Sequence, residues 1–169
     1  MITSFVLIGG VLLSPAASAN AAKEATSTYS DQSYEEFKDY TTQLFALEPY
    51  EAKAFTALES IDTQVTSANR KSMYLKLTNT VIPNYTKFVS KAKQIKPTNP
   101  QLKKIHATFI KGSYTQLEGY LLYKKAVSTN KVNYTLLKQG NTKVNTAEVL
   151  MDQCEQQLYA YARSLGYDS

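Results

Sequence analysis

The final third of the chain carries an unbroken row of apolar and small residues. They recur at spacings of three and four, which is typical of the face of a helix that packs on other helices. The row covers about eight helical turns. Its members are Leu137, Gly140, Val144, Ala147, Met151, Cys154, Leu158, Tyr161 and Leu165. Glycine costs about 1 kcal/mol relative to alanine inside a helix, so Gly140 marks either a close helix crossing or a later helix start.

Three earlier rows keep the same spacing. The first runs from about Asp31 to Val65, through Phe37, Tyr40, Leu44, Leu47, Glu51, Ala54, Leu58 and Ile61. The second covers about residues 72–95, through Tyr74, Leu77, Val81, Tyr85, Phe88, Ala92 and Ile95. The third runs from Pro100 to about Ser128, through Leu102, Ile105, Phe109, Leu117, Leu121 and Val127. Four long helices joined by short turns predict an all-α fold, an antiparallel up-down four-helix bundle.

Prolines interrupt the first two rows and open the third. Pro49 falls within the first row, which allows either one long kinked helix or two helices with Pro49 in the first turn of the second. Because the apolar phase continues across Pro49, we expect the kink, and a second kink at Pro83. Asn99 followed by Pro100 is the pattern of an N-cap and first helical residue. Long, proline-kinked helices are therefore predicted.

The N-terminus has the pattern of an export signal. Residues 1–13 are almost wholly apolar, and Ala17-Ser18-Ala19 follows as a small-x-small cleavage pattern. We expect a cleaved signal peptide over residues 1–19, a flexible lead-in over 20–30 and the helical domain over 31–169. The stretch departs from the pattern in lacking a positively charged start, and no cysteine lies nearby to take a lipid. The expected location is secreted or in the cell envelope.

Charge is distributed in three blocks along the chain. Residues 20–66 hold three lysines and nine acidic residues, a net charge of −6. Residues 67–143, the positive block, hold fifteen basic residues and one acidic residue, Glu118, a net charge of +14. Residues 144–169 hold Arg163 and four acidic residues, a net charge of −3. The second and third predicted helices thus form a basic hairpin between two acidic helices.

Two interpretations of this hairpin remain open. The acidic and basic helices could pair along their edges, with each exposed pair worth about 0–1 kcal/mol. Alternatively, part of the positive charge faces solvent and binds an anionic wall polymer, an anionic membrane surface or an acidic protein. Fourteen of the fifteen basic residues are lysines, which suit diffuse attraction rather than the bidentate recognition that arginine gives, so specific nucleic-acid binding is not expected. The candidate anion-binding residues are Lys87, Lys91, Lys103, Lys104 and Lys111.

Recognisable catalytic and metal motifs are missing from the sequence. His106 is the one histidine and lacks the second ligand that a zinc or di-iron motif needs. Ser90 and Lys93 form a Ser-x-x-Lys, but the companion elements of serine acyl-enzymes are absent. Cys154 lies in the last apolar row, where a thiol behaves as a small hydrophobic group. We therefore expect no enzyme activity, cofactor or metal.

Three short stretches resemble one family. The run Pro97–His106, the segment Gln116–Tyr120 and the segment Lys138–Asn141 are similar to the C-terminal half of small exported or lipid-anchored helical proteins of unassigned function in Gram-positive bacilli. The resemblance implies an envelope location and a recurring helix position for His106, and it implies no activity. The chain departs from many such proteins in lacking the lipid-anchor cysteine.

Two functional hypotheses follow. The first is an extracytoplasmic, non-enzymatic helical bundle that acts as a binding module through its lysine-rich hairpin. The second is a membrane-active or partner-sequestering protein whose bundle opens to expose its apolar rows, which is motivated by the interruptions at Pro49 and Pro83.

Overall fold

The computed structural model describes residues 31–61 and 64–167. Every regular element within these ranges is helical, which confirms the all-α prediction. The elements are α1 (Asp31–Phe45), α2 (Glu48–Glu59), α3 (Arg70–Lys76), the π-helical η1 (Leu77–Val81), α4 (Ile82–Ala92), α5 (Pro100–Ala126) and α6 (Tyr134–Ser164). The expected signal peptide and lead-in lie outside the described residues.

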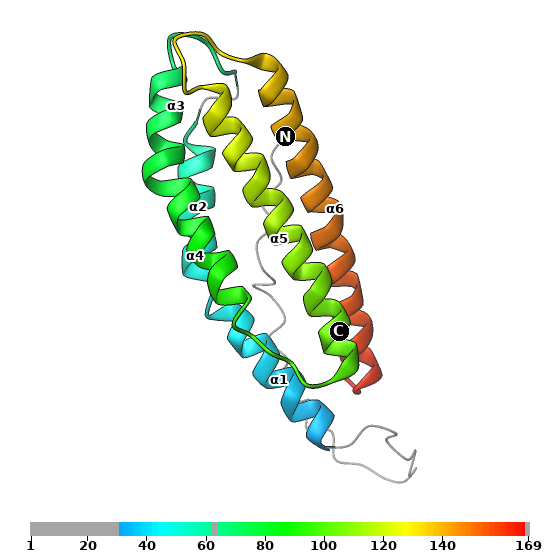
Figure 1. Cartoon of the computed structure of the whole chain (residues 1–169). Coiled ribbons are helices and arrows are strands. Elements are labelled where there is room, and N and C mark those ends of the chain that lie inside the picture. The colour runs from blue at the N-terminus through cyan, green and yellow to red at the C-terminus, as the bar shows by residue number, and fades with distance from the viewer. Residues whose placement is uncertain (1–30, 62–63, 168–169) are drawn as a thin grey trace.

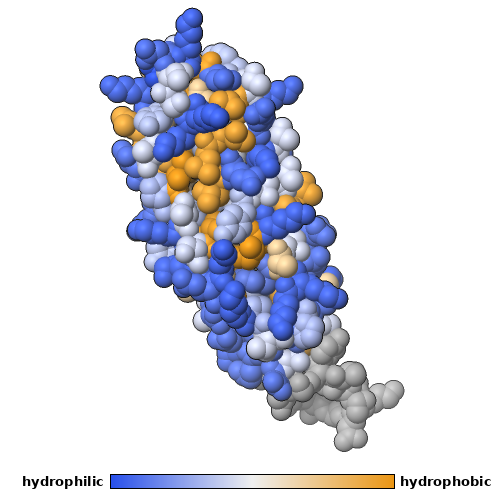
Figure 2. Space-filling view, in the orientation of Figure 1, coloured by the Kyte–Doolittle hydropathy of each residue, from blue (hydrophilic) through white to orange (hydrophobic). Residues whose placement is uncertain are grey.

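These elements form four rods that lie side by side (Figure 1). The first rod is α1 followed by α2, the second is α3, η1 and α4, and the third and fourth are the long helices α5 and α6. Polar side chains cover most of the face shown in Figure 2, apart from a strip of apolar side chains over the second rod and α5.

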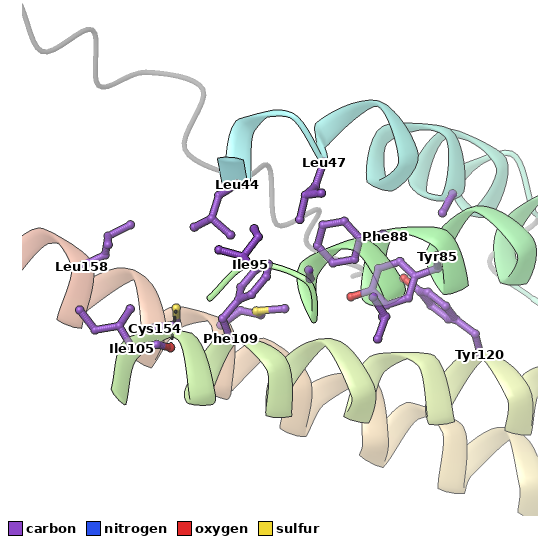
Figure 3. Packing of buried hydrophobic residues seen from close by; sticks show 14 of the residues in the cluster. Leu44, Leu47, Tyr85, Phe88, Ile95, Ile105, Phe109, Tyr120, Cys154 and Leu158 are labelled. Atoms are coloured by element: carbon purple, nitrogen blue, oxygen red, sulfur yellow. Dashed lines mark hydrogen bonds between the residues drawn. The ribbon is translucent and has the colours of Figure 1, made fainter. Parts of the chain in front are cut away.

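The predicted apolar rows form the core. Figure 3 shows side chains from all four rods pointing into one interior, among them Leu44 from α1, Phe88 from α4, Phe109 from α5 and Leu158 from α6. Aromatic rings pack edge to face within it, as for Phe88 and Phe109, whose centroids are 5.8 Å apart. The row of the last helix is confirmed as a buried face of α6, with Ala147, Met151, Cys154, Leu158 and Tyr161 all buried.

The expected single kinked helix at Pro49 is wrong. α1 ends at Phe45, and α2 begins at Glu48 with Pro49 in its first turn, where a missing backbone N–H leaves no helical bond unmade. Leu47 in the turn between them stays buried, and its backbone N–H bonds the Leu44 carbonyl at 3.0 Å. The apolar phase therefore continues although the helix does not, because the turn itself contributes a core residue.

Pro83 is accommodated by a wide helical turn. η1 ends at Val81, two residues before Pro83, and the Ile82 backbone N–H bonds the carbonyl of Leu77, five residues earlier. The wider turn changes the hydrogen-bond register just before a residue that cannot donate. The Asn84 side chain then donates to the Thr80 carbonyl at 2.7 Å, so it occupies one of the acceptors near the proline.

α5 begins as predicted but buries a different face near its middle. The Asn99 side chain accepts hydrogen bonds from the backbone of Gln101 at 2.8 Å and Leu102 at 3.2 Å, which confirms the N-cap. Leu121, expected in the core, is 47% exposed, and Leu117 is only partly buried. The prediction for Leu121 is wrong because the buried face is made here by small, polar and tyrosine side chains. They are Gly112, Ser113, Gln116, Gly119, Tyr120 and Tyr123.

Two glycines mark the close crossing of α5 and α6. A Cβ atom on Gly140 would lie 2.6 Å from the Tyr123 ring and 3.2 Å from the Gly119 carbonyl oxygen. A Cβ atom on Gly119 would lie 2.7 Å from a Val144 methyl group and 3.2 Å from the Gly140 carbonyl oxygen. Of the two interpretations of Gly140, the close crossing is confirmed, because α6 begins well before it at Tyr134.

Glu36 fastens α1 to the connection before α5. Its Oε1 accepts hydrogen bonds from the Thr98 backbone N–H at 2.5 Å, the Thr98 hydroxyl at 2.7 Å and the Asn99 backbone N–H at 2.6 Å. Partial burial works to raise the pKa of Glu36, but these hydrogen bonds and the charge of Lys103 outweigh it, so the pKa is lowered from 4.5. The carboxylate is therefore the form that the fold favours.

We expect Glu36→Ala to lower the free energy of unfolding by about 1 kcal/mol, since three hydrogen bonds to a largely solvated carboxylate are lost. The folded-state pKa is depressed, so the contribution is present above pH 4.5 and disappears as the pH falls below it. Urea unfolding at neutral and acidic pH measures both effects. Glu35→Ala on the same turn is the control, and an equal loss in that variant would contradict the role of Glu36.

Candidate functional site

The five predicted lysines lie on two adjoining rods. Lys87 and Lys91 lie on α4, and Lys103, Lys104 and Lys111 lie on α5; all five side chains are exposed. The structure gives them different surroundings. The Lys91 ammonium lies over the Tyr50 ring, 5.5 Å from its centroid, which turns this side chain toward α2. Lys103 lies close enough to Glu36 to lower the pKa of that carboxyl.

Ion pairing does not account for the positive block. Among the described side chains the structure shows one ion pair, between Lys143 Nζ and Glu118 Oε2 at 2.6 Å, and both residues are about half exposed. Glu118 is the sole acidic residue in the positive block, and it is already paired with Lys143. Apart from the attraction of Lys103 to Glu36, the predicted pairing of acidic and basic helix edges is therefore not found in residues 31–61 and 64–167. Most of the fifteen basic side chains are exposed and form no ion pair with a carboxylate of these residues.

Three exposed lysines follow one outer face of α5. Lys104, Lys111 and Lys125 belong to a series with a seven-residue period, which places neighbouring members on nearly the same side of a helix. Glu118 stands in the third position of the series, between Lys111 and Lys125, and is paired with Lys143. We call Lys104, Lys111 and Lys125 the lysine line. Adjacent positions in the series are separated by about 10 Å along the helix axis.

An exposed set of apolar side chains lies beside the lysine line and was not expected. Tyr114 and Leu121 are 39% and 47% exposed, and Leu117 and Ile82 are partly buried against the core. We call Ile82, Tyr114, Leu117 and Leu121 the apolar strip. Figure 2 shows hydrophobic side chains gathered over the second rod and α5, the two rods that carry these residues. The spacing of 114, 117 and 121 is a second helical row beside the buried one, and this spacing was the signal that could have revealed it.

A polar cluster is enclosed in the core between α2, α4 and α5. Glu51 is 3% exposed, and Tyr85, Ser113 and Tyr120 are fully buried. The Gln116 amide donates to the Tyr120 hydroxyl at 2.6 Å, and the Ser113 hydroxyl donates to the Phe109 carbonyl at 2.9 Å. The Tyr85 hydroxyl makes no hydrogen bond with the described residues. Because these groups are closed off from solvent, they form a structural feature rather than a site for substrate.

Burial controls the ionisation of this cluster. Desolvation, and secondarily the charge of Glu48, raise the pKa of Glu51 from 4.5 to about 8. Glu51 is therefore mostly protonated at neutral pH. Desolvation also raises the pKa of Tyr85 and Tyr120 well above that of a free phenol, so both hydroxyls stay neutral.

His106 and Cys154 take up structural positions. The Tyr40 hydroxyl lies 3.3 Å from His106 Nδ1, and desolvation together with the charge of Lys96 lowers the pKa of His106. The Cys154 thiol is buried and lies 3.7 Å from the Ile105 carbonyl oxygen. Desolvation, and secondarily the charge of Glu155, raise its pKa to about 12, so the thiolate is scarce at neutral pH.

An open hollow of about 520 Å³ lies where α5 begins and α6 ends. Its lining residues are Ser33, Asn99, Pro100, Gln101, Ala160, Tyr161 and Ser164. None of the five predicted lysines lines this hollow, so the surface that carries these lysines is separate from the hollow.

Two further findings concern residues 31–61 and 64–167, the part of the chain that the structure describes. This part of the chain contains no group of three or more His, Cys, Asp or Glu side chains placed to share a metal ion. Nor does any helix in it combine the length and apolarity that crossing a membrane requires. Comparison of the chain with protein-family models, with curated proteins and with solved structures finds no match.

Proposed function

We propose that the chain is an extracytoplasmic, non-enzymatic binding module that contacts an anionic envelope partner through its lysine-rich surface. Its scaffold is an up-down bundle of four antiparallel rods. Two contacts support this arrangement for the second and third rods. Lys93 at the end of the second rod meets Tyr114 in the middle of α5, whereas Tyr74 near the start of the second rod meets Lys124 close to the end of α5.

The observation that carries the proposal is that the described carboxylates neutralise little of the positive charge through ion pairs. Fifteen basic residues fall within residues 67–143, and Lys143 is the one that forms an ion pair with a described carboxylate. Like charges held on neighbouring rods repel, so an anionic partner that lies across them gains from several cations at once. The exposed side chains Lys87, Lys104 and Lys111 keep their charge free for that contact.

Lysine chemistry indicates which kind of contact this is. An ammonium on a flexible stem is a point charge without fixed geometry, and it suits a polymer or surface that carries many repeating negative groups. Attraction of this kind weakens as salt screens it. A poly(glycerol phosphate) wall polymer and a phosphatidylglycerol membrane both present such groups.

We expect the protein to be retained on immobilised poly(glycerol phosphate) at about 50 mM NaCl and released by about 300 mM, where the screening length has fallen about 2.5-fold. A variant with Lys87, Lys91, Lys103, Lys104 and Lys111 changed to glutamine should pass through at the lower concentration. Circular dichroism of this variant checks that its helices are intact. Retention that does not depend on salt, or a well-folded variant that is retained like the wild type, would rule out the proposal.

A further inference from the structure

The apolar strip lies between two rods and is bounded at both ends. At one end the Lys124 ammonium lies over the Tyr74 ring, 5.9 Å from its centroid, and at the other end Lys93 lies over the Tyr114 ring at 5.5 Å. With the two rods antiparallel, this register places Ile82 opposite the segment from Leu117 to Leu121. The strip is thus a shared surface of the second rod and α5, and it does not belong to one helix alone.

The exposure of its members limits what can cover it. Ile82 and Leu117 are partly buried against the core, whereas Leu121 on the same surface is 47% exposed. A flat bilayer surface would reach Leu121 but would leave the lower side chains uncovered. Side chains that project between the two rods would cover all of them, which is how a helix packs its ridges into the space between two others.

The charges around the apolar strip indicate which kind of partner surface it can bind. Lys93 and Lys124 stand at its ends, and Lys111 and Lys125 of the lysine line run beside it on α5. A second copy of this face would bring the same lysines against each other and would be repelled. A helix with acidic residues on both sides of an apolar row would meet opposite charges instead.

The second rod is also irregular at this place. η1 ends one residue before Ile82, and the hydroxyl of Thr78 within η1 is buried without a hydrogen-bond partner among the described residues. A π-helical turn is a costly local feature that is frequently found at functional sites. Its position beside the strip agrees with a surface used for binding.

From these observations we infer that the apolar strip is a docking surface for an acidic amphipathic helix of a partner protein. The segment from Tyr114 to Lys124 covers about three helical turns. The partner helix would present apolar residues at helical spacing over a similar length, with Asp or Glu on both sides. This inference goes beyond the proposed function, because it concerns a surface that the five predicted lysines do not define.

The test uses a labelled synthetic helix of about 14 residues with leucines at positions i, i+3, i+7 and i+10 and glutamates beside them. A second peptide has the same composition with the leucine positions scrambled. Fluorescence anisotropy with the full chain measures both affinities at about 50 mM and about 300 mM NaCl. We expect the patterned peptide to bind at least about tenfold more tightly than the scrambled one, and the ratio to persist at the higher salt because it arises from apolar contact.

Leu121→Ala should weaken the patterned peptide by at least about fivefold, since Leu121 is the most exposed apolar side chain of the strip. Val149→Ala is the matched control, because Val149 is 66% exposed on α6 and lies outside the strip. Equal binding of the two peptides would overturn the inference and would leave the lysine-based proposal standing. A Leu121→Ala variant that loses affinity for phosphatidylglycerol vesicles but keeps its affinity for the patterned peptide would also overturn the inference.

Discussion

Glu51→Gln is expected to stabilise the folded protein at pH 9 by on the order of 3 kcal/mol and to change its stability by less than about 1 kcal/mol at pH 5. In the fold the pKa of Glu51 is about 8, compared with an ordinary value of 4.5 that applies to the unfolded chain. The folded state therefore holds this proton more tightly. The contribution of the Glu51 proton to the free energy of unfolding is fully present below pH 4.5. It decreases as the pH rises from 4.5 to about 8 and is lost above about pH 8.

The size of the effect follows from the same two values. Each tenfold difference in proton affinity is worth about 1.4 kcal/mol, so the upper limit is about 5 kcal/mol, and relaxation around the charged side chain reduces it. Glutamine is neutral at every pH and has nearly the same shape. Urea unfolding of both proteins between pH 5 and 9 measures the difference. Glu48→Gln, one turn away and exposed, is the control and should show a much smaller change.

Curves of stability against pH that run parallel for the wild type and Glu51→Gln would show that Glu51 does not hold a proton in the folded protein. That result would contradict the desolvation of Glu51 by burial, which raises its pKa in the folded protein.

Gly140→Ala is expected to lower the free energy of unfolding by about 2 kcal/mol, even though alanine favours the helix by about 1 kcal/mol. The added methyl group would lie 2.6 Å from two carbons of the Tyr123 ring. That ring has little room to move, because it is buried and its hydroxyl donates to Asn141 Oδ1 at 2.6 Å. The helices must therefore separate where they cross most closely.

Gly112→Ala is the matched control, on the facing helix α5 of the same pair. Its added Cβ atom would meet the Met151 sulfur at 3.1 Å and the Leu150 Cβ atom at 3.3 Å. The thioether is flexible and can give way, so the gain in helix propensity should offset most of the cost, and the variant should lie within about 1 kcal/mol of the wild type. Thermal and urea unfolding compare the three proteins. A Gly140→Ala variant as stable as Gly112→Ala would contradict the close crossing.

The sequence was sufficient for the last helix and insufficient for the middle of α5. The α6 row could be read because its core positions are apolar, from Ala147 to Leu158. In α5 the core positions include Ser113 and Gln116, which hydropathy does not distinguish from surface residues, so Leu121 was assigned to the core although it is exposed. Glu51 fell in the first apolar row, but its protonation depends on neighbours from α4 and α5 that the sequence does not reveal.

The candidate site was also predictable from the sequence only in part. Exposure of the five lysines followed from their places between the apolar rows. Whether acidic side chains reach them depends on how each rod is rotated about its axis, and spacing along one helix does not fix that rotation. Lys91 turns toward Tyr50 and Lys143 toward Glu118 for this reason. The apolar strip was missed because it combines residues from two rods.

The salt dependence of binding to poly(glycerol phosphate) tests the central claim, that the lysine surface is left free for an anionic partner. We compare the wild type with Lys104→Gln/Lys111→Gln and with Lys38→Gln/Lys53→Gln, which makes the same charge change on the acidic first rod. In a plot of log K against log salt concentration, the first pair should reduce the slope by about 1.5, since each cation in contact contributes about 0.7–0.9. The second pair should keep the slope of the wild type. Equal slopes for all three proteins, or an equal reduction in both pairs, would contradict the claim.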